Sequence, residues 1–189
     1  MLLRGFFSVS LLAVSASAFA DAVDINLNDS SAQLQYKAAL GGTNLGKSEF
    51  DMGAVYNQKN NLLGEAGLLV KDDVGGNAPG VSVGVGLKAL SARIATANAN
   101  ASALALGGMV RYSPLAERRL GFVGQLYLSP SIVTFGGANS YMDTGARVEY
   151  EVIPQAVVYL GYRKISFNLK NVGNTTFDEG VNIGMRMMF

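Results

Sequence analysis

The last ten residues, 180-GVNIGMRMMF-189, decide the fold class of this chain. Every second residue is apolar and the residues between them are mostly polar, which is the period of a β-strand with one apolar face. At the end of a soluble protein, such a strand leaves an open edge that invites aggregation. A closed barrel removes that edge because its last strand pairs with its first, and in lipid a sheet must close. We therefore predict an all-β protein, an antiparallel transmembrane β-barrel, whose closing strand presents Val181, Ile183, Met185, Met187 and Phe189.

The first twenty residues have the three parts of a secretory signal peptide. Arg4 supplies the positive charge, residues 6–14 form a short apolar run, and Ala18-Phe19-Ala20 forms a cleavage site before Asp21. The sequence thus predicts a cleaved signal peptide at residues 1–20 and one barrel at residues 21–189. The expected location is the outer membrane.

Composition excludes several functional classes. Removal of Arg4 from the 15 basic residues leaves 14, which equals the 14 acidic residues, so the mature chain lacks the basic field that nucleic acid requires. Cysteine and histidine are absent, so we expect no disulfides, no metal site and no cofactor. A serine nucleophile normally uses histidine as its base, and we therefore expect no enzyme activity.

Alternating segments follow one another along the mature chain, separated by clusters of Gly, Asn, Asp, Ser and Pro. Apart from the short segment at residues 23–28, each is close to the length of a tilted strand that crosses a bilayer. Ten strands are expected, with eight as the alternative if two weak segments are loops. The segments are residues 23–28, 32–40, 49–57, 62–70, 81–89, 103–112, 120–128, 141–150, 156–165 and 180–189.

The connections in the second half predict an orientation. If the C-terminus is periplasmic, the short connections at residues 113–119 and 151–155 lie on the periplasmic side. The longer stretches at residues 129–140 and 167–178 then form outer loops, as is usual for such barrels.

Charged residues gather on the inward face of the predicted strands. A barrel of this size has room for little more than its own side chains, and unpaired charge in that space is costly. We therefore expect a lumen largely filled by ion pairs, with a narrow porin-like channel for small solutes as the alternative. The inward charges are Lys37, Glu49, Asp51, Glu65, Lys88, Arg111, Asp143, Arg147, Glu149, Arg163 and Arg186.

One motif points to a different class of protein. Residues 41–48, GGTNLGKS, match the phosphate-binding loop G-x-x-x-x-G-K-[ST], which works where a helix follows the loop. From Glu49 onward the chain alternates with a period of two, so a polar hairpin turn is expected instead. A soluble nucleotide-binding protein and a periplasmic β-sandwich are the two remaining alternatives.

Four stretches carry a resemblance to a known family. LLVKDDVGGN (68–77), ALALGG (103–108), GARVEYEVIP (145–154) and VYLGYR (158–163) resemble the YfaZ family of outer-membrane proteins. The tract at residues 91–100 departs from the acidic loop expected there. The resemblance implies a small barrel without assigned catalytic residues. We expect a monomer in outer-membrane lipid, inserted by the barrel-assembly machinery through its C-terminal strand, with a structural or surface-interaction role.

Overall fold

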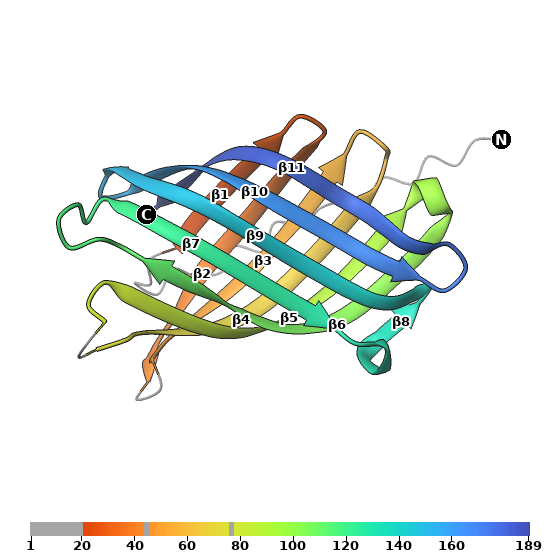
Figure 1. The fold of residues 1–189 in the computed structure, drawn as a ribbon, viewed down its shortest axis with the longest axis horizontal. Coiled ribbons are helices and arrows are strands. Elements are labelled where there is room, and N and C mark those ends of the chain that lie inside the picture. The colour runs from red at the N-terminus through yellow and green to blue at the C-terminus, as the bar shows by residue number, and fades with distance from the viewer. Residues whose placement is uncertain (1–20, 44–45, 76–77) are drawn as a thin grey trace.

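A single antiparallel sheet curls around and closes on itself to form a barrel (Figure 1). The structure, a computed structural model, describes residues 21–43, 46–75 and 78–189, and the predicted signal peptide at residues 1–20 lies outside the described residues. Within the described ranges, no helix has the length and apolar character needed to cross a membrane.

Ten long strands build the barrel, as the alternation of the sequence predicts. Every predicted segment lies within one of them, except that Phe189 follows the end of the last strand. The short strand β8 (Thr134–Gly136) pairs with β6 beyond the point where β7 ends. The long strands are β1 (Asp21–Asn28), β2 (Ser31–Thr43), β3 (Gly46–Asn57), β4 (Leu62–Asp73), β5 (Val81–Ile94), β6 (Ala99–Tyr112), β7 (Leu120–Ser129), β9 (Ala138–Ile153), β10 (Ala156–Leu169) and β11 (Gly173–Met188).

The C-terminal strand closes the sheet. β11 pairs with β1 from Ala22↔Met188 to Asn28↔Asn182, and β5 pairs with β6 to complete the circle. Backbone hydrogen bonds join Asp21 and Phe189 in both directions, at 3.2 and 2.9 Å. Since one closed sheet replaces two stacked sheets, the β-sandwich alternative is wrong, and so is the count of eight strands.

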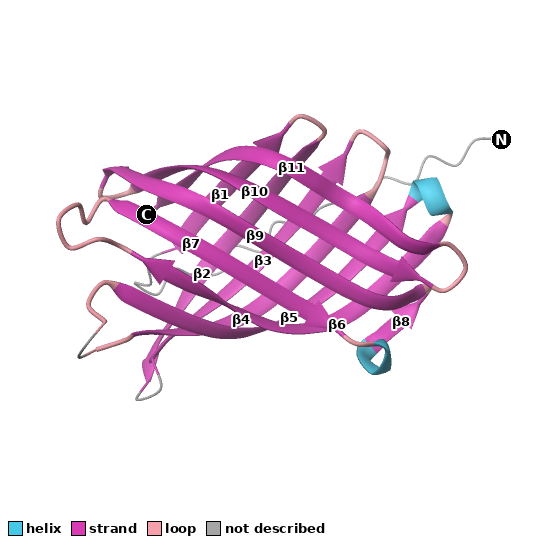
Figure 2. Ribbon diagram, in the orientation of Figure 1, coloured by secondary structure: helices cyan, strands magenta, loops and turns pink. Residues whose placement is uncertain are grey.

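The barrel has two distinct ends. We call the one that holds Asp21 and Phe189 the terminal end; the connections β2–β3, β4–β5, β6–β7 and β9–β10 lie there too. The opposite end, which we call the far end, carries β1–β2, β3–β4, β5–β6, β7–β9 and β10–β11. Figure 2 shows two short 3₁₀ helices at the far end, η1 (Ala95–Ala97) and η2 (Ser131–Val133).

Three stretches expected to be loops are largely strand. The predicted outer loop at residues 167–178 reduces to a turn at residues 170–172, because β10 and β11 continue to Leu169 and Gly173. The tract at residues 91–100 contains the end of β5, the 3₁₀ turn η1 and the start of β6. The stretch at residues 129–140 also holds η2, β8 and the start of β9. The long strands β5, β6, β9, β10 and β11 exceed the length that a bilayer requires, which is about 9–11 residues.

Most of the barrel has an apolar outer surface. Outward side chains such as Leu34, Val85, Leu106 and Ile183 are 57–66% exposed, although each is strongly apolar. Their neighbours along each strand point inward and are polar or small, as Gln33, Gly86 and Asn182 are. A water-soluble sheet has the reverse arrangement, so this outer surface is built to meet an apolar medium.

The polarity of the strands inverts toward the far end. Along β5, Leu87 points outward and Lys88 inward, but six residues later Arg93 points outward and Ile94 is completely buried. The same change occurs on β6, β10 and β11. The far end therefore has an apolar core like that of a soluble protein, formed by Val55, Leu63, Leu90, Ala92, Ile94, Ala101, Ala103, Ala105, Tyr127, Ala138, Tyr141, Ile165, Phe167, Leu169 and Phe177.

Candidate functional site in the barrel lumen

Three arginines converge on one buried carboxylate in the terminal half of the lumen. Glu149 of β9 accepts a hydrogen bond from Arg111 of β6, from Arg147 two residues earlier on β9 at 2.8 Å, and from Arg186 of β11 at 3.1 Å. The Glu149 side chain is 1% exposed, whereas those of the three arginines are 15–28% exposed. The carboxylate thus lies behind a layer of guanidinium groups.

Asp24 of β1 extends this cluster. It accepts a hydrogen bond from Arg186 Nε at 3.1 Å and another from the Tyr159 hydroxyl. Tyr159 reaches Asp24 by crossing over Gly184, where a Cβ atom would lie 2.2 Å from the Tyr159 ring. The Arg147 guanidinium lies over the same ring, 4.9 Å from its centroid, in a cation–π contact. A glycine at position 184 is therefore a steric requirement of the cluster.

A second ion-pair group lies on the neighbouring strands. Glu49 of β3 is 3.7 Å from Lys37 Nζ of β2 and also contacts Lys71 Nζ of β4. Lys71 is the more exposed of the two lysines and lies closer to the terminal end, because β4 ends at Asp73.

Lys88 forms two ion pairs in the middle of the lumen. Its ammonium group lies 3.5 Å from Glu65 and 3.4 Å from Asp143, and 4.4 Å from the centroid of the Tyr127 ring. Gln35 donates a hydrogen bond to Asp51 at 3.0 Å. A cavity of about 70 Å³ lies among these groups. The space is large enough for ordered water between polar side chains.

A further ion pair lies between the middle and the far end. Arg163 of β10 contacts Asp178 of β11 at 2.6 Å, and Asn28 donates to the same carboxylate at 3.0 Å. A β-bulge between Ile165 and Ser166 shifts the register, and both Phe177 and Asp178 are consequently buried. The bulge places an apolar and a charged side chain inside the barrel at consecutive positions.

All eleven charges assigned to the lumen from the sequence face the interior, and ten form ion pairs within 4 Å. Asp51 is the exception, since its described partner is the neutral Gln35. Sequence reasoning missed three more lumen charges. Asp24 shares the inward face of β1 with Asn26. Lys71 lies one residue beyond the predicted segment at residues 62–70, and Asp178 lies in the predicted outer loop at residues 167–178.

The lumen is closed at the far end and open at the terminal end. At the far end, Phe167 packs against Tyr141 and Phe177 with ring centroids 5.1 and 6.0 Å apart. At the terminal end, a cavity of about 480 Å³, which we call the cup, lies in front of the arginine cluster. The expectation of a lumen filled by ion pairs therefore holds for its middle, while its far end is filled by apolar side chains.

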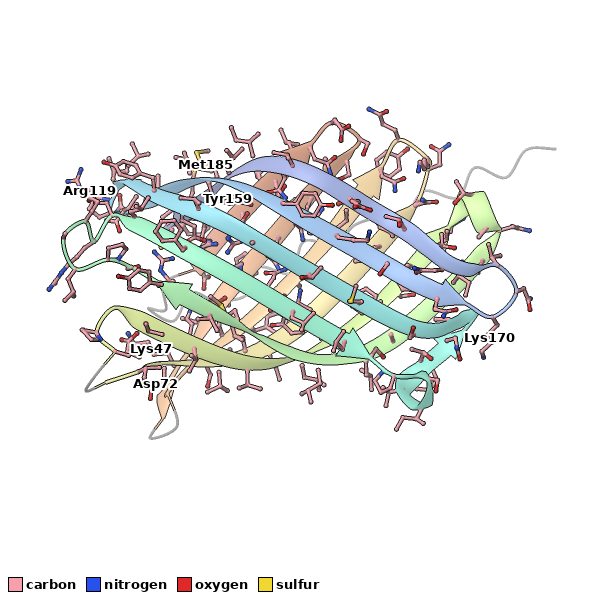
Figure 3. All side chains as sticks on the ribbon, viewed as in Figure 1. Lys47, Asp72, Arg119, Tyr159, Lys170 and Met185 are labelled. Carbon is pink, nitrogen blue, oxygen red and sulfur yellow. The ribbon has the colours of Figure 1, made fainter. Side chains whose placement is uncertain are left out.

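The match to a phosphate-binding loop falls at the mouth of the cup. Gly41 and Gly42 pair with Ser48 and Lys47 across a hairpin, and the strand β3 follows where a nucleotide-binding protein needs a helix. Asn44 and Leu45 lie outside the described residues. Figure 3 shows Lys47 and Asp72 near each other at this end, with Lys170 at the opposite end. The alternative of a soluble nucleotide-binding protein is therefore wrong, because such a protein requires a different fold.

One of three comparisons with known proteins, the one with family models, agrees with the resemblance seen in the sequence. No curated protein matches the chain significantly. A solved chain from a study of the in-meso crystallization of membrane proteins is 10% identical, with a TM-score of 0.45 and coverage of 90% of this chain and 83% of that chain. The family model described as YfaZ precursor matches residues 4–189. Since the match extends over nearly the whole sequence, the chain belongs to the YfaZ family.

Proposed function

We propose that the protein is a non-conducting barrel of the outer membrane with a structural or surface-interaction role. The observation that carries this proposal is the apolar core of the far end. Tyr141, Phe167 and Phe177 are at most 2% exposed, and they lie across the lumen that a solute would have to cross.

The outer surface supports insertion into a membrane. Burial of an apolar side chain away from water stabilises by about 1.5–3 kcal/mol, so the exposed Leu, Val, Ile and Met residues favour lipid over water. Hydrogen bonds between β1 and β11 join the first strand to the last, and an apolar medium requires a sheet to close in this way. The predicted signal peptide and the family description as a precursor support export.

The paired charges of the lumen support a rigid interior. A lone buried charge costs several kcal/mol, and here Lys88 lies between Glu65 and Asp143, so its charge is balanced. Such ion pairs hold β4, β5 and β9 in one arrangement across the barrel. A barrel of this kind presents fixed surfaces at its ends.

Conductance in planar lipid bilayers tests the proposal. The purified mature protein is expected to insert without producing current steps in molar KCl. A Tyr141→Ala, Phe167→Ala double variant removes two of the rings at the far end and is expected to produce small steps. Its folding is checked by the heat-dependent shift in gel mobility that closed barrels show in SDS.

The second candidate is a narrow channel for small solutes, favoured by the polar cup and by the water-sized cavity deeper in the lumen. Regular current steps from the unmodified protein would establish it and refute the closed lumen. Recovery of the protein from the soluble periplasm, without a heat-dependent shift, would refute the outer-membrane location itself. Assembly through the C-terminal strand, a monomeric state and the absence of catalysis and cofactors stay predictions.

A further inference from the structure

We infer that the cup is a binding site for a small organic anion, with a carboxylate or phosphate group on an apolar body. The cup lies at the terminal end and has about 480 Å³ of space, within the range of small-molecule pockets. The inference goes beyond the closed barrel proposed above, because a blind lumen can still hold a ligand that enters at the terminal end.

The floor of the cup carries an excess of positive charge. Five cationic side chains face three carboxylates, which leaves two formal positive charges without a balancing acid among these described residues. The five cations are Lys37, Lys71, Arg111, Arg147 and Arg186, and the three carboxylates are Asp24, Glu49 and Glu149.

The arrangement of these side chains leaves the excess positive charge accessible to a ligand in the cup. Glu149 is 1% exposed and Asp24 is 4% exposed, so the acids beneath the arginines are hidden. Arg111 remains 28% exposed and Lys71 37% exposed, and both line the cup. Glu149 holds the arginines in place while their remaining N–H groups stay available, and guanidinium forks match the geometry of carboxylate and phosphate.

The wall of the cup is apolar in part. Ala22, Val157 and Met188 line it from β1, β10 and β11, and Met109 lines it from β6, two residues before Arg111. Inorganic phosphate would use only the floor, whereas an organic anion would also cover this wall. The cationic floor and the apolar part of the wall together indicate a ligand that has an anionic group on an apolar body.

The mouth of the cup is acidic on balance, with one lysine and three carboxylates. Lys47 lies there with Asp72, Asp73 and Glu151, and Asp73 accepts a hydrogen bond from Ser82 at 2.5 Å. This acidic rim disfavours polyanions such as nucleic acid, because several of their charges would lie against the rim. A compact ligand with one anionic group reaches the floor without that repulsion.

Titration calorimetry on the mature barrel in a nonionic detergent tests the inference. Phenyl phosphate and benzoate are the probes, inorganic phosphate reports the charge alone, and benzylammonium reports the apolar body with the opposite charge. Phenyl phosphate is expected to bind best, inorganic phosphate more weakly, and benzylammonium not at all. Arg111→Gln and Lys71→Gln are each expected to weaken phenyl phosphate binding by roughly tenfold, as loss of a charge-assisted contact does.

Lys170→Gln is the matched control, since it removes one positive charge from the far-end turn (Figure 3). It is expected to leave binding unchanged. Absence of phenyl phosphate binding, or equal weakening by Lys170→Gln, overturns the inference. Equal affinity for inorganic phosphate overturns the role of the apolar wall. Binding and conductance are read separately, so a conducting barrel that binds phenyl phosphate refutes the closed lumen alone.

Discussion

At the scale of single residues, Glu149 has the largest structural role in the lumen. Its two carboxylate oxygens accept from arginines on three strands, and one of those arginines also holds Asp24. No other carboxylate in the described part of the chain pairs with as many cations. Its removal would leave the cations of the cluster facing one another.

Glu149→Gln is therefore expected to destabilise the barrel strongly. Removal of one member of a buried ion pair costs about 3–5 kcal/mol, because the other member is left uncompensated. Unfolding in urea, followed by the heat-dependent gel shift, measures this change. Glu179→Gln is the control, since Glu179 pairs with Lys164 on the exposed outer surface and its loss is expected to have little effect. Similar losses in both variants would show that the convergence on Glu149 does not contribute the extra stability.

At the scale of strands, we expect the inversion of polarity on β5, β6, β10 and β11 to mark where these strands leave the apolar medium. On β5 the outward residues change from Val85 and Leu87 to Ser91 and Arg93 within six positions. The inward residues change in the opposite sense, from Lys88 to Ile94. A strand that stayed in lipid over its whole length would keep one polarity pattern throughout.

Site-directed spin labelling can locate this boundary, and the chain contains no cysteine that would interfere. A label at Val85→Cys is expected to be more accessible to oxygen, which dissolves in lipid, because Val85 is outward and mid-barrel. A label at Arg93→Cys is expected to be more accessible to a water-soluble nickel chelate. Equal accessibility profiles at the two sites would refute the boundary and place the far end of β5 in lipid.

At the scale of the whole molecule, the barrel is asymmetric along its axis. The terminal end is open, polar and lined by arginines, whereas the far end is filled with apolar side chains. In an outer-membrane barrel with an even number of strands, both termini lie on the same side. A periplasmic C-terminus would thus direct the cup to the periplasm and the apolar core outward.

Thiol labelling on intact cells tests this orientation. Lys170→Cys, in the far-end turn, is expected to react with a membrane-impermeant maleimide on intact cells. Arg119→Cys, next to β7 at the terminal end (Figure 3), is expected to react only after the outer membrane is permeabilised. The reverse pattern would invert the barrel and open the cup to the outside of the cell.

The sequence alone is sufficient to predict the fold class, because a period of two with an apolar outward face is a local property that neighbouring residues define. It also determined which face of each strand carries the lumen charges, and the C-terminal strand as the closing strand. Which charges meet depends on the alignment of the strands, since Arg111, Glu149 and Arg186 lie on three strands whose register is a property of the whole sheet. Register likewise decided the apolar core of the far end: Ile94, Ala138 and Phe167 contribute to it only because aligned strands bring them to one level.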